Sequence, residues 1–325
     1  VFRGNTIGWE QIQRRDGQYL GGGTGSNTGL GTRGAWGGGR TPGYSDTIDF
    51  ITISTLGDAQ DFGNLTVARA VEGALSSSTR GVWAGGYNPV VNTIDFITFS
   101  SIGNAQNFGD MSYDIFNSGA LSNEIRGIFA GGQNSSGNQQ NTLSYITISS
   151  QGNTVNFGDF TSVRDSPHGC ASPTRGLFFG GGDKNQPSVK DDIEFVTIAT
   201  TGNTTDFGDM SLARTCVGTC SNSTRAIGGG GSIAYVNTNV IDLITISTLG
   251  DAIDFGDLTT ARGVLDAMSS QTRGVFGGGR IDSSSNSVNT LDHIEIQTTG
   301  DAVDFGDLSV TRWVLSGCSN GHGGL

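Results

Sequence analysis

Proline, histidine and cysteine are scarce in this chain of 325 residues, which contains 5 Pro, 3 His and 4 Cys. No spacing links His168, His293 or His322 to a serine nucleophile or to a set of metal ligands, so neither a catalytic triad nor a metal site is predicted. Long apolar runs are also missing, since none approaches the ~20 residues that a bilayer-spanning helix needs. The sequence indicates no cofactor.

Basic residues are few as well: 18 Lys and Arg stand against 30 Asp and Glu, which gives a net charge of −12. Nucleic-acid binding depends on clustered Lys and Arg that neutralise phosphates, so this charge argues against it. Glycine, by contrast, accounts for 54 residues. Such a composition suits tight turns and small-residue strands, as in an extracellular or virion-type β protein.

A repeat of about 48 residues accounts for most of the chain. An arginine triplet recurs six times, and successive arginines are 47, 46, 49, 50 and 48 residues apart. A period of that size is typical of repeat architectures. The triplets are Thr32-Arg33-Gly34, Thr79-Arg80-Gly81, Ile125-Arg126-Gly127, Thr174-Arg175-Gly176, Thr224-Arg225-Ala226 and Thr272-Arg273-Gly274.

Each repeat divides into four short strand-like pieces, called A to D. Residues 71–76 and 81–86 represent pieces A and B, and residues 47–54 and 59–62 represent C and D. Piece C is apolar on both faces, as a strand packed on two sides requires. Between C and D stands Gly-Asp or Gly-Asn, as at Gly57-Asp58, which predicts a two-residue hairpin.

Four strands per repeat predict an all-β fold, a six-bladed β-propeller with four-stranded antiparallel blades. A blade can bury both faces only between two neighbours. One phenylalanine per repeat is therefore expected to pack between blades and to bury about 150 to 200 Å². These residues are Phe62, Phe108, Phe157, Phe207, Phe255 and Phe305.

Over residues 32–320 the pattern resembles the kelch repeat. It shares the glycines that end piece B, a variable loop, an acidic residue in piece C, an aromatic residue in piece D and an Arg before piece A. It differs in having Phe where kelch repeats usually have Trp, and in the Gly-Asp or Gly-Asn pair. The resemblance implies a propeller fold and no particular activity.

The order of the pieces predicts how the ring closes. The first repeat starts at piece B, near Thr32, whereas the chain ends with a piece A, in residues 313–318. Pairing the two ends would complete a blade and remove two open sheet edges. Residues 20–31 are a weaker candidate for the missing piece A of the first repeat.

The predicted domains are an N-terminal arm, residues 1–31, and a propeller, residues 32–325. The arm is either a loose tail or a docking segment that includes Trp9, Arg14 and Arg15.

Charged residues recur in columns of the repeat. An arginine precedes piece A in five repeats, and Ile115 takes its place in the sixth. Piece C carries an acid at Asp49, Asp95, Glu194, Asp242 and Asp292. We expect Arg–carboxylate pairs and turn hydrogen bonds that hold the loops, because a guanidinium suits fixed bidentate geometry. The alternative is an acidic ring that binds cations or sugar hydroxyls.

The cysteines follow the repeat too. Cys170, Cys220 and Cys318 share one column with Leu75, Leu121 and Met268, which is the behaviour of a small buried hydrophobe. Free thiols are therefore predicted, Cys216 included.

The recurring Asp-Phe-Gly, as at 61–63, matches part of a kinase motif but lacks the partner motifs, and we interpret it as a strand-end turn. No enzyme is predicted.

The B-to-C loops vary most between repeats, and in such a blade they lie at one end of the ring. These loops supply the candidate binding residues, for a glycan or a protein; ordinary solvated loops are the plain alternative. The candidates are Tyr44, Tyr87, Asn134, Lys184, Lys190, Tyr235, Arg280 and Asp282.

The repeated phrase around 47–69 also resembles repeats in virion structural proteins of tailed phages, especially marine and cyanobacterial ones. That resemblance implies a non-enzymatic virion protein of the tail (a tail-fibre component among the options), neck or capsid, with other virion proteins and a host glycan or receptor as partners. The alternative is a secreted or cell-surface lectin or adhesin of the same fold, located outside the cell. A glycan-active enzyme is a distant third.

Overall fold

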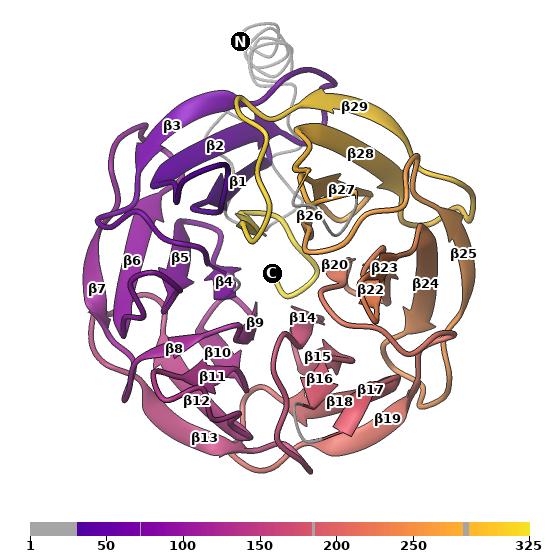
Figure 1. Cartoon of the computed structure of the whole chain (residues 1–325), viewed down its shortest axis with the longest axis horizontal. Helices are drawn as coiled ribbons and strands as arrows, with labels where there is room; N and C mark the ends of the chain where they lie inside the picture. Colours follow the sequence, from indigo (N-terminus) through magenta and orange to yellow (C-terminus); the bar gives the residue numbers. More distant parts are fainter. Residues whose placement is uncertain (1–30, 72, 184–185, 282–285) are drawn as a thin grey trace, which may run out of the picture.

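Six four-stranded antiparallel sheets surround a central axis in the computed structural model, which describes residues 31–325 except 72, 184–185 and 282–285. Each sheet is one blade, and the predicted six-bladed propeller is confirmed (Figure 1). The arm residues Trp9, Arg14 and Arg15 lie outside the described residues. Among the described residues, no helix is long and apolar enough to cross a membrane.

The blades are numbered from 1 to 6, and their strands run from the axis outward. The innermost strands are β30 (Ser316–Ser319), β4 (Gly73–Ser76), β9 (Gly119–Ser122), β14 (His168–Ala171), β20 (Gly218–Ser221) and β26 (Asp266–Ser269). The second strands are β1 (Arg33–Gly37), β5 (Arg80–Ala84), β10 (Arg126–Ala130), β15 (Arg175–Phe179), β21 (Arg225–Gly229) and β27 (Arg273–Gly277).

The third and outer strands complete each blade. The third strands are β2 (Thr47–Thr52), β6 (Thr93–Thr98), β12 (Thr142–Thr147), β18 (Asp192–Thr197), β24 (Val240–Thr245) and β28 (Thr290–Glu295). The outer strands are β3 (Gln60–Asn64), β7 (Gln106–Asp110), β13 (Val155–Asp159), β19 (Thr205–Asp209), β25 (Ile253–Asp257) and β29 (Val303–Asp307). Short pairs add to three blades: β8 (Ile115–Phe116) with β11 (Gln133–Asn134), β16 (Gly182–Asp183) with β17 (Gln186–Val189), and β22 (Ser232–Ile233) with β23 (Val236–Asn237).

The two ends of the chain close the ring, as predicted. Strand β30 pairs antiparallel with β1, so that Gly34 faces Ser319 and Gly37 faces Ser316. Trp313 lies before this strand, in the connection from β29, and not within the inner strand as the sequence suggested. Strand β30 occupies the innermost position of blade 1, for which residues 20–31 are the weaker candidate; of these, residues 20–30 lie outside the described residues.

Apolar residues of adjacent blades form the core. The cluster around Phe50 and Phe62 of blade 1 also contains Trp83 and Phe99 of blade 2, and equivalent clusters lie between the other blades. All six phenylalanines of the predicted column are buried, with exposures of 1% or 2%. Phe62 meets Phe50 edge to face, at 5.7 Å between ring centroids. The predicted packing between blades is confirmed.

The predicted two-residue hairpin between the third and outer strands is wrong. In blade 1 the connection runs from Thr52 to Gln60, and its Gly57-Asp58 pair contacts the preceding blade. The Gly57 amide donates to the Phe305 carbonyl at 2.9 Å, and the Asp58 carboxylate accepts from the Asp307 amide at 3.1 Å. The same two bonds recur at all six junctions. Gly-Asp is therefore a clasp between outer strands.

The Asp-Phe-Gly motif lies within the outer strand rather than in a strand-end turn. Gly63 follows a register shift between Ile48 and Asp49, which marks a β-bulge, and its φ is +148°. A Cβ at Gly63 would stand 2.5 Å from the carbonyl oxygen of Gly103 in blade 2. Glycine is required here because the backbones of neighbouring blades touch.

In five of the six blades, the arginine that precedes the inner strand forms a buried ion pair with the acid of the third strand in the same blade. Arg312 reaches Asp49 at 2.6 Å, and both side chains are fully buried. Burial lowers the pKa of the Arg312 guanidinium, and Asp49 opposes that shift. The equivalent pairs are Arg69–Asp95, Arg164–Glu194, Arg214–Asp242 and Arg262–Asp292. The predicted pairing is confirmed, and these acids do not form an exposed ring.

Blade 3 replaces the whole pair. Ile115 occupies the arginine position, and the third strand carries the buried Ser144 where other blades carry an acid. A buried carboxylate without its cation would be strongly destabilising, so the two changes compensate each other.

The arginines of the six triplets join neighbouring blades, and among them only Arg273 also pairs with a carboxylate of the described residues, that of Glu295 at 2.8 Å. Arg80 donates from Nη1 to the Ile148 carbonyl of blade 3 at 2.8 Å and stacks over Phe96 at 4.9 Å. All six triplets make the corresponding hydrogen bond to the next blade. This column thus ties the ring together around its whole circumference.

All four cysteines are free thiols, as predicted. Three of them are buried in the shared column, and burial raises the pKa of Cys170 to about 12. Cys216 is only partly buried and belongs to the connection before β20.

We predict that Arg214→Ile lowers the free energy of unfolding by about 3 to 5 kcal/mol, because Asp242 is left buried without a cation. The double variant Arg214→Ile with Asp242→Ser copies the Ile115 and Ser144 arrangement of blade 3 and should recover at least half of that loss. Urea unfolding of the three proteins measures this. Equal losses in the single and double variants would contradict the ion-pair interpretation.

Deletion of 316–325 removes β30 and leaves the β1 edge without its partner, so the truncated chain should melt far below the full chain or aggregate. Deletion of 1–30, which removes none of the described strands, is the matched control and should melt like the full chain. Thermal melting followed by circular dichroism tests both. The closure model fails if the two deletions behave alike.

Candidate functional site

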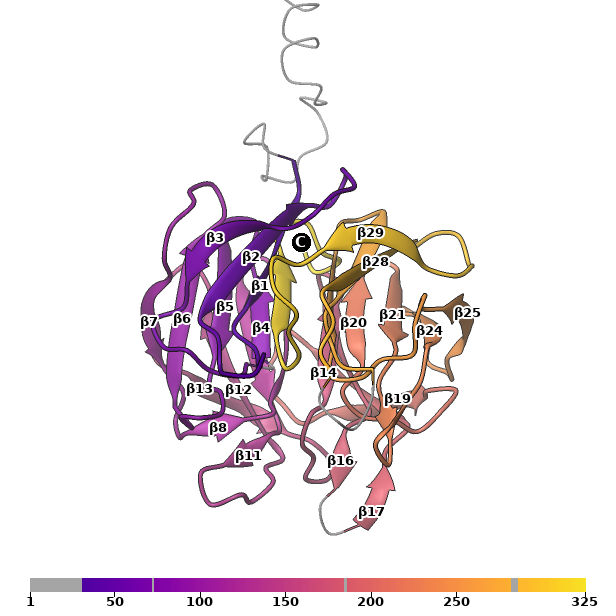
Figure 2. The ribbon, with the colours of Figure 1, turned by 45° about the horizontal axis from the view of Figure 1, so that its top comes forward.

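The ring has two distinct faces. We call the end with the second-to-third-strand loops and the outer-to-inner-strand connections the loop face; the opposite end, where the described chain begins and ends, is the termini face. Figure 2 shows β8, β11, β16 and β17 on the side away from the C-terminus. Loop variation therefore gathers on the face opposite to the one on which the described chain begins, at Gly31.

A ring of backbone bridges surrounds the axis on the loop face. In every blade the first residue of the loop pairs antiparallel with a residue of the connection before the inner strand. In blade 1, for example, the Arg40 amide donates to the Trp313 carbonyl at 2.7 Å, and the Trp313 amide donates to the Arg40 carbonyl at 3.0 Å. We call these twelve residues the mouth ring. The pairs are Arg40–Trp313, Tyr87–Ala70, Gln133–Phe116, Gly182–Asp165, Ser232–Thr215 and Arg280–Gly263.

Aromatic and arginine side chains gather on one half of the mouth ring. Arg40 and Arg280 lie over the Trp313 ring, at 5.2 and 5.1 Å from its centroid. Arg40 also stacks on Tyr44 at 5.5 Å. We call the continuous set Arg280, Trp313, Arg40, Tyr44, Tyr87 and Phe116 the aromatic strip.

The strip continues across blades 1, 2 and 3. The Tyr44 and Tyr87 centroids are 6.2 Å apart, and those of Tyr87 and Phe116 are 5.0 Å apart. The ring planes are tilted by 58° and 52°. Each member is only partly buried, and Tyr87 keeps 45% of its surface exposed. The strip is therefore accessible from solvent.

The other half of the mouth ring is small and polar. The Gln133 amide of blade 3 donates to the Asp165 carboxylate of blade 4, and the Asn237 amide of blade 5 donates to the Arg280 carbonyl of blade 6 at 2.8 Å. Here the side chains link neighbouring blades.

Tyr235 stands apart at the tip of the β22–β23 hairpin. The two turn residues, Ala234 and Tyr235, have φ of +47° and +70°, a conformation that costs about 1 kcal/mol or more for a residue other than glycine. The turn leaves 76% of Tyr235 and 70% of Val236 exposed. The strained turn thus exposes the Tyr235 ring to solvent.

The structure brings together three of the predicted binding residues, Tyr44, Tyr87 and Arg280, in the aromatic strip. Asn134 caps its own loop, since its Oδ1 accepts from the Ser136 and Asn138 amides at 3.0 Å. Lys190 donates to Ser162 Oγ at 2.7 Å and lies 3.8 Å from Asp192. Lys184 and Asp282 lie outside the described residues.

Sequence reasoning missed Arg40, Trp313 and Phe116. Arg40 directly follows the glycines of the second strand, and the other two belong to the connections before inner strands. The sequence did contain a signal at the repeat position that follows the arginine before piece A. Trp313 and Phe116 align there with Ala70, Thr215 and Gly263, so a large aromatic side chain is unusual at this position.

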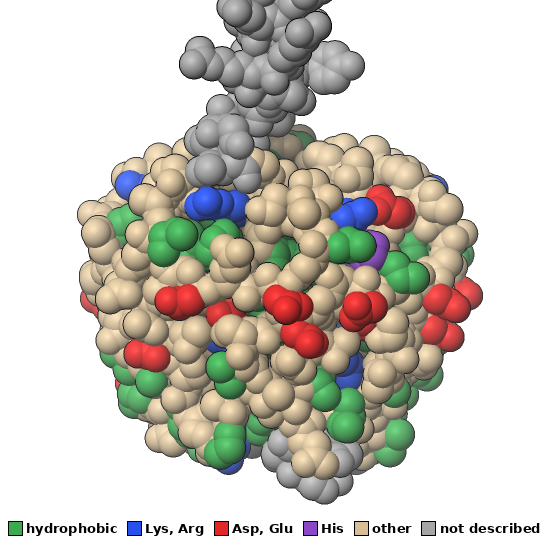
Figure 3. Space-filling model, turned by 90° about the horizontal axis from the view of Figure 1, so that it is seen from above, with side chains coloured by type: hydrophobic (Ala, Val, Ile, Leu, Met, Phe, Trp, Pro, Cys, Tyr) green, Lys and Arg blue, Asp and Glu red, His purple; other side chains and the backbone are tan. Residues whose placement is uncertain are grey.

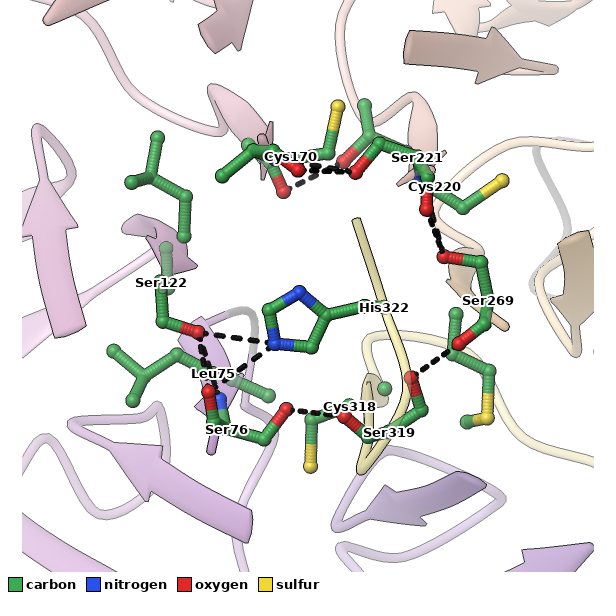
Figure 4. Close-up of a pocket in the computed structure, with 18 of the residues that line it drawn as sticks. Leu75, Ser76, Ser122, Cys170, Cys220, Ser221, Ser269, Cys318, Ser319 and His322 are labelled. Carbon is green, nitrogen blue, oxygen red and sulfur yellow. Dashed lines mark hydrogen bonds between the residues drawn. The ribbon is translucent and has the colours of Figure 1, made fainter. Parts of the chain in front are cut away.

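A small cavity of about 50 Å³ lies on the axis between the inner strands (Figure 4). Serine hydroxyls ring it: Ser76, Ser122, Ser221, Ser269 and Ser319 each donate to a carbonyl of the preceding blade at 2.5 to 2.8 Å. Blade 4 has Ala171 at this position. The hydroxyls are thus already used in joining the inner strands.

His322 from the C-terminal segment points into this cavity (Figure 4). The Gly324 amide donates to Nδ1 at 3.0 Å, so the proton belongs on Nε2, which lies 3.2 Å from the Ser76 carbonyl. Burial lowers the pKa of His322 to about 4, while the Ser76 carbonyl and Glu124 oppose the shift. The segment is docked with a neutral histidine.

Asp266 and His168 meet in the fold although no sequence spacing linked them. Their Oδ1 and Nδ1 atoms are 3.6 Å apart, and Asp266 Oδ2 accepts from Ser316 Oγ at 2.8 Å. Ser316 donates to the Asp266 carboxylate. In a Ser-His-Asp triad the serine hydroxyl is instead bonded to the histidine, so this arrangement is not a triad. Within the described residues, no group of three or more His, Cys, Asp or Glu side chains could hold a metal ion.

No protein-family model matches this chain, and a search of curated proteins finds no match either.

We predict that docking of the C-terminal segment weakens as the pH falls from 6.5 to 4. Above pH 6.5 the histidine is neutral both docked and released; below it, only the released form takes a proton, which favours release by up to about 3 kcal/mol. Amide hydrogen exchange at Gly324 measures docking, and His322→Gln, which cannot titrate, is the control. Identical pH dependence in both proteins would contradict this assignment.

Proposed function

We propose that this chain is a non-enzymatic virion protein, a propeller displayed on tail, neck or capsid, that holds a protein or glycan partner on its loop face. The observation that carries the proposal is that the repeated residues stabilise the ring, whereas the residues that vary between blades are accessible on the loop face. The repeated Arg–carboxylate pairs hold the connection before the inner strand within a blade, and the triplet arginine, serine and phenylalanine columns join neighbouring blades. The aromatic strip and Tyr235 are accessible and differ from blade to blade.

The arrangement of the faces supports a role in attachment. The arm continues from Gly31 on the termini face, so an arm bound to a parent assembly would leave the loop face free for a partner. Aromatic residues with arginine are the side chains that most often anchor protein interfaces. The repeats that resemble those of phage virion proteins support the virion setting, and a secreted lectin or adhesin would use the same face.

The charge of the outer strands does not favour nucleic acid as a partner. Asp61, Asp254 and Asp304 are exposed there, and Figure 3 shows acidic side chains gathered along the rim. Together with the net charge of −12, this supports a partner other than nucleic acid.

Two variants test the two attachments separately. Replacing Tyr44, Tyr87 and Tyr235 with Ser should leave the ring folded, with a loss of about 1 kcal/mol from the Tyr44–Tyr87 contact, and should weaken binding of purified rings to host cells at least tenfold. Deleting 1–30 should leave that binding intact but abolish incorporation into particles.

The matched control replaces Leu56, Ile102 and Leu249, which are 57%, 61% and 57% exposed on the termini-face connections, with Ser. It removes similar exposed apolar surface and should bind host cells like the parent. If the tyrosine variant binds like the parent as well, the loop face is not the binding surface. Incorporation without the arm would exclude the arm as the attachment.

A further inference from the structure

Two arginines of the aromatic strip differ from the other arginines of the structure. The buried column arginines pair with acids, and the triplet arginines donate to carbonyls of the next blade. Within the described residues, the guanidiniums of Arg40 and Arg280 have no hydrogen bond to an acceptor and no ion pair, and only ring contacts hold them. In a chain with 30 acidic and 18 basic residues, guanidiniums with neither a carboxylate nor a carbonyl partner are unexpected.

Stacking fixes both guanidiniums without using their donors. A guanidinium that lies flat on an aromatic ring keeps its in-plane N–H groups free, and these groups match the oxygen atoms of a carboxylate or sulfate. Both guanidiniums contact the ring of the same residue, Trp313. Both backbones are held by mouth-ring bridges, Arg280 through bonds of 2.9 and 3.0 Å with Gly263. The donors are therefore positioned before any ligand arrives.

We propose that Arg40, Trp313 and Arg280 bind the acidic groups of a polysaccharide, and that Tyr44 and Tyr87 extend the site along the chain of sugars. This inference rests on the proposed function for the face that binds and adds the chemistry of the partner. A sugar ring has an apolar C–H face and a rim of hydroxyls. The partly exposed tyrosines offer ring edges and hydroxyls that complement both.

Charge density favours an acidic glycan over nucleic acid. Duplex DNA carries about one charge per 1.7 Å, and a molecule of net charge −12 would repel it. A polysaccharide with one acid per sugar, or fewer, needs only the few cations that the strip supplies. An acidic peptide is the competing partner. It is disfavoured because the strip rings already contact each other and Arg40, so their faces are less available to the apolar anchor side chains on which peptide binding depends.

Isothermal titration of the full chain with a hexamer of galacturonic acid tests the proposal. Its methyl ester, which has the same sugars without the charge, is the ligand control, and a hexamer of glutamate represents the acidic peptide. We expect the acidic sugar to bind, the ester to bind at least about tenfold more weakly, and binding to weaken as salt rises.

Arg40→Gln and Arg280→Gln should each weaken binding of the acidic sugar at least about tenfold, and Arg40→Lys should restore little, because an ammonium cannot stack flat or present a fork of donors. Arg273→Gln removes an equal charge from the termini face and should bind like the parent. Melting curves establish that each variant is folded.

The outcomes separate this inference from the proposed function. Equal binding of acid and ester, unchanged affinity in the Arg40 and Arg280 variants, or tighter binding of glutamate would each overturn the acidic-glycan site. If the galacturonate hexamer does not bind while the tyrosine variant still loses host-cell binding, the proposed function stands and this inference fails. If the tyrosine variant keeps host-cell binding, the proposed function fails.

Discussion

The constraint on which the structure depends is that each sheet must bury both faces. Ile48 and Ile51 point to opposite sides of the same strand and are both buried, and every core cluster takes residues from two adjacent blades. A linear stack of such sheets would leave one apolar face open at each end. Closure through β30 and β1 removes both open faces, and the last inner strand of the chain therefore belongs to the first blade.

Closure also requires that the connections between blades keep fixed geometry, because an error at one junction would displace all the others. Three sets of contacts fix them: the buried Arg–carboxylate pairs at the inner connections, the triplet arginines between second and third strands, and the Gly-Asp clasp at the rim. Blade 3 shows that the first set can be replaced, provided that arginine and acid change together. The inner connection can therefore be held either by a buried ion pair or, as in blade 3, by an uncharged pair of residues.

Most of the fold could be predicted from the sequence, because the repeat period, the apolar third strand and the displaced last strand are properties of the order of residues. What could not be predicted depends on contacts between repeats. The Gly-Asp pair has the local composition of a hairpin, and only its position against the preceding blade shows that it is a clasp. Gly228 likewise lacks the aromatic residue of its column, and Phe179 of the neighbouring blade fills the space, since a Cβ at Gly228 would lie 3.3 Å from the Phe179 ring.

The candidate site was predictable only in part, for a related reason. Loop length pointed to the loop face and to Tyr44, Tyr87 and Arg280, but Trp313 and Phe116 belong to connections that look like the beginnings of strands. They meet the loop residues only because the mouth-ring bridges continue the pairing of inner and second strands toward the loop face.

Those bridges also explain how one face can vary while the ring remains intact. Each bridge consists of backbone N–H and C=O groups, so it places no demand on the side chains that it carries. Pairs as different as Arg40–Trp313, Gly182–Asp165 and Ser232–Thr215 form it with similar hydrogen-bond distances. The scaffold therefore holds twelve side-chain positions around the axis at fixed places whatever residues occupy them. A chain built from near-identical repeats can acquire one asymmetric surface in this way, by substitution at the mouth ring alone, without loss of the contacts that close the ring.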